Sequence, residues 1–166
     1  MPGAVSDSST LIHLAKIGHL HLLLDFHQSI LIAPAVWREV FQEGKDWPGS
    51  SEIEVGRGGG WIDVVAPANQ ALVSSLLEDL HEGESETIAL AIERCPDIVF
   101  LDESDARKKA RAYGLNISGV IGILIRAEKE GKISSLKEEL DRLRNDSGFW
   151  IGEDVYQNAI HSSEQK

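Results

Sequence analysis

The chain has 166 residues, of which 42% are hydrophobic and 26% are charged, and we expect it to form a single domain over residues 1–166. Its 16 basic and 27 acidic residues give a formal net charge of −11, which disfavours long-range attraction to nucleic acids and to anionic membranes. One cysteine and the lack of a long apolar run exclude a disulfide framework, a cysteine-rich zinc site and a membrane-spanning helix. We expect a cytoplasmic protein with no membrane partner.

Short apolar runs alternate with helical patterns in the first part of the chain. The expected elements are a strand at 4–6, helices at 8–17 and 19–26, a strand at 29–32 and a helix at 34–42. Residues 8–10 supply candidate N-caps for the first helix, and Gly18 follows its end. The glycine-rich residues 44–60 predict a mobile excursion with about one helical turn.

The same alternation continues to the end of the chain. The expected elements are a strand at 61–65, helices at 68–79 and 82–94, a strand at 98–101, a helix at 104–113, a strand at 115–118, helices at 119–129 and 136–145, and a final helix before a frayed tail at about 161–166. Several of these strands are continuous apolar runs, which is typical of a parallel sheet covered on both faces. The pattern therefore predicts an α/β fold.

Two aspartates directly follow predicted strands. Asp7 comes after the strand at 4–6, and Asp102 comes after the strand at 98–101. Ligands of open parallel sheets gather beyond the carboxyl ends of the strands, so both residues are candidates for a binding site. Alternatively, each aspartate caps the helix that follows it, although Ser104 and Asp105 offer other caps beside Asp102.

Two glutamates lie beside predicted apolar surfaces. Glu39 falls between apolar neighbours when the helix at 34–42 is projected at about 100° per residue, although its side chain could also extend past the edge of the core. Glu86 opens a strongly apolar run, so its carboxylate would be partly desolvated and would favour a nearby cation. The alternative for Glu86 is a capping box with Gly83 as the N-cap.

Asp7, Glu39, Glu86 and Asp102 thus form a candidate cluster of four carboxylates. A single pair of like charges about 4 Å apart costs about 4 kcal/mol at an effective dielectric constant of about 20. Such a cluster therefore requires either protonation or a divalent cation. Ligation by oxygen alone favours Mg²⁺ or Mn²⁺ over zinc.

Four basic residues follow Asp102 closely along the chain: Arg107, Lys108, Lys109 and Arg111. One interpretation is the solvated face of a surface helix. The other is an edge that binds the phosphates of a nucleic-acid backbone beside the metal cluster, which would locally overcome the repulsion that the net charge predicts.

Short motifs over about residues 5–145 resemble those of PIN domain nucleases, in the same order. The matching segments are Val5–Ser9, Val36–Val40, Gly83–Ala91, Leu101–Glu103 with Ala106–Arg107, Gly119–Leu124 and Glu130–Ile133. The Gly-Glu-x-Glu pattern at residues 83–86 is similar to that of a VapC-like branch of uncharacterised PIN proteins predicted to bind nucleic acid. The resemblance implies a PIN-like fold with three layers, α/β/α, around a small central parallel sheet.

The resemblance also implies metal-dependent cleavage of a phosphodiester, usually in RNA. Its catalytic metal ligands would be Asp7, Glu39, Glu86 and Asp102.

The resemblance also concerns two positions next to these ligands. Ser9 takes the position of a hydroxyl that would hold Asp7 by a hydrogen bond. The branch usually has two consecutive aspartates where this chain has Asp102-Glu103, so Glu103 and the nearby Asp105 are further candidates for the fourth ligand.

The resemblance and the carboxylate cluster together predict an endoribonuclease that depends on Mg²⁺ or Mn²⁺. The resemblance further implies a homodimer that would act as the toxin of a toxin–antitoxin pair, with an antitoxin protein as partner. The alternative is a non-catalytic PIN-fold protein whose acidic surface binds a basic protein partner. Phosphoryl transfer with Asp7 as nucleophile is disfavoured, because Ser9 stands where a haloacid-dehalogenase site requires a second aspartate.

Overall fold

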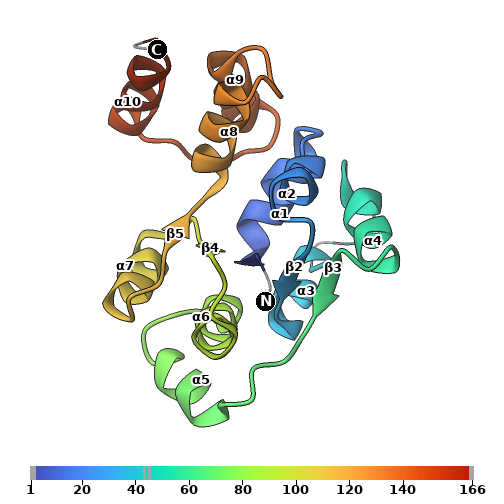
Figure 1. The fold of residues 1–166 in the computed structure, drawn as a ribbon, viewed down its shortest axis with the longest axis vertical. Helices are drawn as coiled ribbons and strands as arrows, with labels where there is room; N and C mark the ends of the chain where they lie inside the picture. The colour runs from blue at the N-terminus through green and yellow to red at the C-terminus, as the bar shows by residue number, and fades with distance from the viewer. Residues whose placement is uncertain (1–2, 43, 45, 165–166) are drawn as a thin grey trace.

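Five parallel strands form the central sheet of the computed structural model, which describes residues 3–42, 44 and 46–164 (Figure 1). Their order across the sheet is β3-β2-β1-β4-β5. The strands are β1 (Ala4–Ser6), β2 (Ile30–Ile32), β3 (Ile62–Val64), β4 (Ile98–Phe100) and β5 (Ile117–Ser118). This sheet confirms the α/β class and the parallel arrangement that the apolar runs predict.

Helices flank the sheet and form most of the connections between its strands (Figure 1). They are α1 (Ser8–Lys16), α2 (His21–His27), α3 (Pro34–Val40), α4 (Ser50–Gly58), α5 (Gln70–Leu76), α6 (Glu82–Arg94), α7 (Ser104–Ala112), α8 (Val120–Lys129), α9 (Leu136–Asn145) and α10 (Glu153–Glu164). Helices α6 and α9 begin and end at the predicted residues, and α8, α9 and α10 pack together at one end of the molecule (Figure 1).

The centre of the sheet is buried on both faces. Val5 of β1, Ile30 of β2 and Val99 of β4 are all fully buried, because helices cover the two sides. This explains why these strands, apart from Ser6, are apolar instead of alternating between apolar and polar residues.

The strand order reverses at β1, which lies between β2 and β4. Crevices at such a reversal, beyond the carboxyl ends of the strands, are where open α/β sheets bind ligands. Asp7 directly follows β1, and its backbone N–H continues the sheet by donating to the carbonyl of Phe100 at 3.0 Å. The topology therefore brings the segments that carry Asp7 and Asp102 to one edge.

The glycine-rich residues 44–60 contain a nine-residue helix, α4, so the prediction of about one helical turn there is wrong. Ile53 of α4 is fully buried, and a Cβ atom added at Gly56 would lie 2.7 Å from the side chain of Ile62. Glycine is thus needed there for close packing of the helix on β3, and it does not mark a loop. Residue 45 of the predicted excursion lies outside the described residues.

The C-terminal helix is longer than expected. Helix α10 continues through residue 164, where the sequence predicts a frayed tail from about residue 161. Tyr156 and Ala159 are buried and attach the helix to the core. Residues 165–166 lie outside the described range, and no helix within that range is long and apolar enough to cross a membrane.

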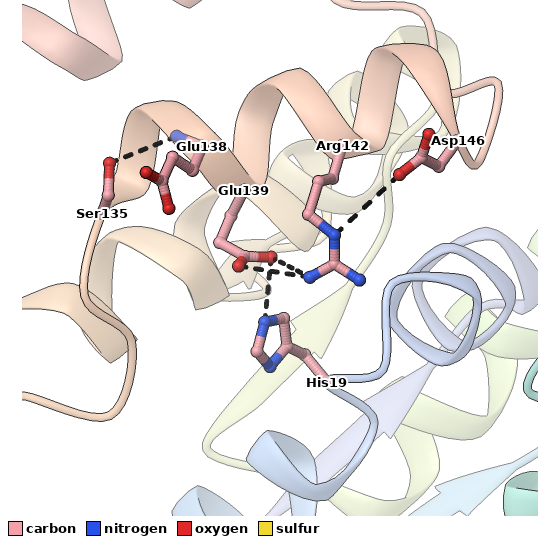
Figure 2. Close-up of polar contacts among 6 residues, drawn as sticks. All are labelled: His19, Ser135, Glu138, Glu139, Arg142 and Asp146. Carbon is pink, nitrogen blue, oxygen red and sulfur yellow. Dashed lines mark hydrogen bonds and ion pairs between the residues drawn. The ribbon is translucent and has the colours of Figure 1, made fainter.

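Glu139 of α9 contacts His19, which lies in the segment that precedes α2 (Figure 2). Its carboxylate lies 2.9 Å from His19 Nε2 and accepts from Arg142 Nη1 at 2.9 Å. The side chains of His19 and Glu139 are 17% and 13% exposed, so solvent screens this contact less than it screens a surface ion pair. The contact links the C-terminal helices to the N-terminal half of the fold.

Replacing Glu139 with glutamine should lower the free energy of unfolding by about 1 kcal/mol, because it removes the charge that both His19 and Arg142 face. Chemical denaturation measures the change. Lys137→Gln is the matched control on the same helix, since it removes only an exposed ion pair with Asp141 and should change stability by no more than about 0.5 kcal/mol. An equal loss in both variants would contradict the importance of the buried contact.

Candidate active site

Asp7 is the N-cap of α1 and is also one of the most buried carboxylates of the described chain. Its Oδ1 accepts from the backbone N–H of Thr10 at 2.9 Å, and its Oδ2 accepts from the backbone N–H of Asp102 at 3.0 Å. The residue is 5% exposed. Burial, followed by the nearby charge of Asp102, raises the pKa of Asp7 to about 8. The capping interpretation is therefore correct for Asp7, and it coexists with an unusually basic carboxylate.

Asp102 lies beside Asp7 at the end of β4. Its Oδ1 accepts from the backbone N–H of Val120 at 3.0 Å, and its Oδ2 accepts from the hydroxyl of Thr10 at 3.1 Å. Burial raises the pKa of Asp102, whereas these hydrogen bonds and the Arg107 charge lower it. A Cβ atom at Gly119 would collide with Asp102 Oδ1, so this glycine makes room for the carboxylate.

The side-chain hydroxyl groups of Ser9 and Thr10 in α1 form hydrogen bonds with Asp102 more than with Asp7. Ser9, expected to hold Asp7, instead forms a side-chain hydrogen bond that lowers the pKa of Asp102. Thr10, which sequence reasoning did not single out as a site residue, contacts both aspartates through its N–H and its hydroxyl. Its position three residues after a helix-capping aspartate is the signal that could have identified it.

Glu39 reaches the same region from α3. Its Oε1 accepts from the hydroxyl of Ser8 at 2.9 Å, and its carboxylate lies against Gly83 in the first turn of α6. A Cβ atom at residue 83 would collide with this carboxylate, which explains the glycine. Glu39 thus lies where α1, α3 and α6 meet.

Glu84 and Glu86 point to different places although they are two residues apart. Helix α6 starts at Glu82, and the backbone N–H of the N-cap, His81, donates to Glu84 Oε1 at 3.2 Å. The capping box therefore involves Glu84, two residues earlier than the alternative with Gly83 and Glu86. Two residues correspond to about 200° around a helix, so Glu86 faces away from Glu84.

Glu86 instead caps the neighbouring helix. Its Oε1 accepts from the backbone N–H of Ala35 at 3.3 Å, near the start of α3, where the N-cap Ala33 has no side-chain acceptor. Burial raises the pKa of Glu86. Burial also raises the pKa of Glu84, and the charges of Glu103 and Glu39 act in the same direction. Glu84 therefore belongs to the acidic group around Glu39, whereas Glu86 is occupied at α3.

A cleft of about 840 Å³ opens over these residues. The carboxylates that line it are Asp7, Glu39, Glu84, Asp102 and Glu103. Glu86 and Asp105 do not line it, so three of the four predicted ligands share the cleft and Glu84 occupies the place expected for Glu86. Of the three candidates near the end of β4, Asp102 and Glu103 face the cleft.

The donor set suits a hard divalent cation. Within the described residues, no three His, Cys, Asp or Glu side chains lie close enough together to form a ligand group by themselves. Mg²⁺ in proteins commonly uses only one or two carboxylates and keeps several waters, so the pair of Asp7 and Asp102 with the other acids around the cleft fits such an ion. A cation there would also offset the burial that raises both aspartate pKa values.

The basic residues of α7 do not form one continuous edge. Arg107 Nη1 donates to the carbonyl of Leu101 at 2.9 Å, and its charge acts on Asp102. Lys109 pairs with Asp79 at 3.1 Å. Lys108 and Arg111 are exposed. The expected phosphate-binding group is therefore divided between inward and outward side chains.

Comparison with known families agrees with this arrangement. The family model described as PIN domain matches residues 3–165, a range that includes all five strands of the sheet and every carboxylate of the cleft. The search of curated proteins found no match to the chain.

Without a divalent cation, we expect the free energy of unfolding to fall by about 2 kcal/mol as pH rises from 6.5 to 8. The pKa of Asp7 is raised in the folded state, from 3.8 to about 8, so the folded protein holds a proton that the unfolded chain has released. Its stabilising effect is therefore lost as pH rises toward 8. His13 opposes this trend mainly below pH 6.5, because burial lowers its pKa from 6.5 to about 4. Denaturation in EDTA measures the change.

Asp102→Asn is the matched variant for this test. Asparagine can still accept from the Val120 N–H and can donate to the Thr10 hydroxyl, while the negative charge beside Asp7 disappears. The stability of Asp102→Asn should depend less on pH over the same range. A wild-type stability that rises between pH 6.5 and 8 would contradict a protonated Asp7.

Proposed function

The chain belongs to the PIN domain family, whose members are commonly nucleases, and from this premise we propose that it is a metal-dependent endoribonuclease. The observation that carries the proposal is the buried pair of Asp7 and Asp102 at the carboxyl ends of adjacent strands. Two carboxylates in one buried place are costly unless a proton or a cation is shared between them. A divalent cation bound at this site would offset that energetic cost.

We propose that Asp7 and Asp102 hold Mg²⁺ or Mn²⁺ directly, and that Glu39 and Glu84, with Glu103 as a further candidate, act on the ion through its water ligands. Such an ion, when bound, would acidify a water molecule for attack on phosphorus and stabilise the leaving oxygen. The chain's own part is to orient the carboxylates. The Val120 N–H and the Thr10 hydroxyl fix Asp102, and the Ser8 hydroxyl fixes Glu39.

Single-stranded or structured RNA is the proposed substrate. Arg107 beside Asp102, together with the exposed Lys108 and Arg111, supports backbone binding next to the cleft, in a protein whose overall charge of −11 would otherwise repel RNA. Lys109 can contribute only by leaving Asp79.

A narrower form of the proposal is that the protein is a VapC-like toxin. The Gly-Glu-x-Glu pattern at residues 83–86 supports it. The acidic surface would then favour a basic antitoxin, and the homodimer expected from the resemblance remains part of this proposal.

Cleavage of RNA in Mn²⁺ should distinguish the role of Glu84 from that of Glu86. We expect Glu84→Gln to lower the cleavage rate about 100-fold, because it removes a charge from the cleft while glutamine preserves the capping box. Asp7→Asn should abolish cleavage. Glu86→Gln is the matched control and should stay within about threefold of wild type, since its amide oxygen can still accept from Ala35.

Thermal unfolding with and without Mn²⁺ gives a second measurement. The wild type and Glu86→Gln should gain stability from the ion, whereas Glu84→Gln and Asp7→Asn should gain less. Loss of cleavage in Glu86→Gln but not in Glu84→Gln would show that the ligand is Glu86. A wild type that neither cleaves RNA nor gains stability in millimolar Mn²⁺ would instead favour the non-catalytic interaction protein.

A further inference from the structure

The chemical character of the cleft changes along α1, from acidic at the start of the helix to basic and aromatic toward its end. Asp7 caps the start of this helix, and Ser9, His13 and Lys16 follow at spacings that place them on one face. At a rise of about 1.5 Å per residue, His13 lies about 9 Å and Lys16 about 13 Å along the axis from Asp7. All of these residues line the cleft, so it extends from the carboxylates to a basic and aromatic region at the other end of α1.

Trp150 is the most exposed large apolar side chain of the described chain, at 84%. Other large apolar side chains are exposed, but within the described residues only Trp150 among them also lines the cleft. Exposure of an indole at the rim of a cleft is typical of a ligand contact, because its apolar faces gain stability only when something covers them.

The backbone holds Trp150 in place on both sides. The preceding residue, Phe149, donates its N–H to Leu143 at 2.9 Å, and its ring packs edge-on against His13 with centroids 4.9 Å apart. The following residue, Ile151, is buried. A Cβ atom at Gly152 would lie only 3.2 Å from the Trp150 ring, so the indole rests closely against this glycine.

His13 itself is fixed by a second contact. Its Nδ1 lies 3.0 Å from the hydroxyl of Ser147, and that hydroxyl donates to the Leu143 carbonyl at 2.7 Å. Since the single hydroxyl proton is used there, His13 Nδ1 is the donor to Ser147. The chain of contacts from α1 through His13 to Phe149 therefore ties the Trp150 loop to the helix that also carries Ser9.

A second indole and a cation lie near the same end. Trp47 donates its Nε1–H to the Val40 carbonyl at 3.0 Å, and Lys16 Nζ lies 5.9 Å from its ring centroid. Lys16 is the one lysine or arginine among the residues that line the described cleft. The region thus offers flat aromatic surface together with a positive charge for a phosphate, which is the combination that single-stranded nucleic acids require.

We propose that Trp150 is a base-stacking subsite that makes the protein select an unpaired nucleotide at the end of the cleft opposite the carboxylates. The inference rests on the proposed function, because it assigns a substrate form to the same cleft. A base in a duplex is already stacked on both faces and cannot cover the indole, whereas an unpaired base can. Lys16 would then meet the backbone of the same strand.

Binding of a single-stranded RNA oligonucleotide, followed by fluorescence anisotropy with Ca²⁺ in place of Mg²⁺ or Mn²⁺ to prevent cleavage, tests the subsite. Trp150→Ala should weaken binding of the single strand about tenfold, and Trp150→Phe should recover most of the affinity because it retains a flat ring. Binding to the corresponding duplex should be the same in all three proteins. Tyr113→Ala, which removes an exposed aromatic ring outside the cleft, is the matched control and should bind as the wild type does.

Equal affinity of Trp150→Ala and wild type for the single strand would overturn the proposal. Trp150 would then be assigned to contact with a protein partner. A loss that is as large for the duplex would also overturn it, since it would indicate contact with the backbone and not with a base. Cleavage of RNA by the wild type is measured in parallel. If cleavage is present and Trp150→Ala binds normally, only the subsite fails, whereas a wild type that neither binds nor cleaves RNA contradicts both proposals.

Discussion

The hydrogen bond from the backbone N–H of Asp102 to the carboxylate of Asp7 is the contact on which the rest of the cleft depends. It joins the ends of β1 and β4, which are adjacent in the sheet although they are far apart in the chain. It also places the partly buried carboxylate of Asp102 beside the buried carboxylate of Asp7, where burial raises the pKa of both and the charge of Asp102 raises that of Asp7 further. The surrounding residues, Thr10 and Val120 above all, supply donors that keep Asp102 oriented.

Several acidic residues combine structural and chemical roles. Asp7 caps α1, Glu84 caps α6 and Glu86 caps α3, so each carboxylate stabilises a helix start whether or not it also binds an ion. A capping interaction therefore does not argue against a functional role. The three capping carboxylates differ in whether they also line the cleft. Asp7 and Glu84 line it, and Glu86 does not.

The cleft also accounts for how an acidic protein could accept a polyanion. Its carboxylates gather at the start of α1, and its lysine and exposed indole lie toward the other end. Attraction over long distances is weak at a net charge of −11, so short-range stacking and the charge of a bound cation would have to supply the affinity.

The order of strands and helices, the parallel sheet and the positions of Asp7 and Asp102 at strand ends follow from the amino-acid sequence alone, because apolar runs and helix periodicity are local properties. Helix α4 does not follow from the sequence alone, because Gly56 allows the helix to pack closely against β3 and a local pattern does not reveal such packing. Only the tertiary structure shows that Glu84 lines the cleft whereas Glu86 does not, and that Ser9 forms a hydrogen bond with Asp102. The packing of α6 against α3 and β1 sets which glutamate faces the cleft, because two residues along a helix turn the side chain by about 200°.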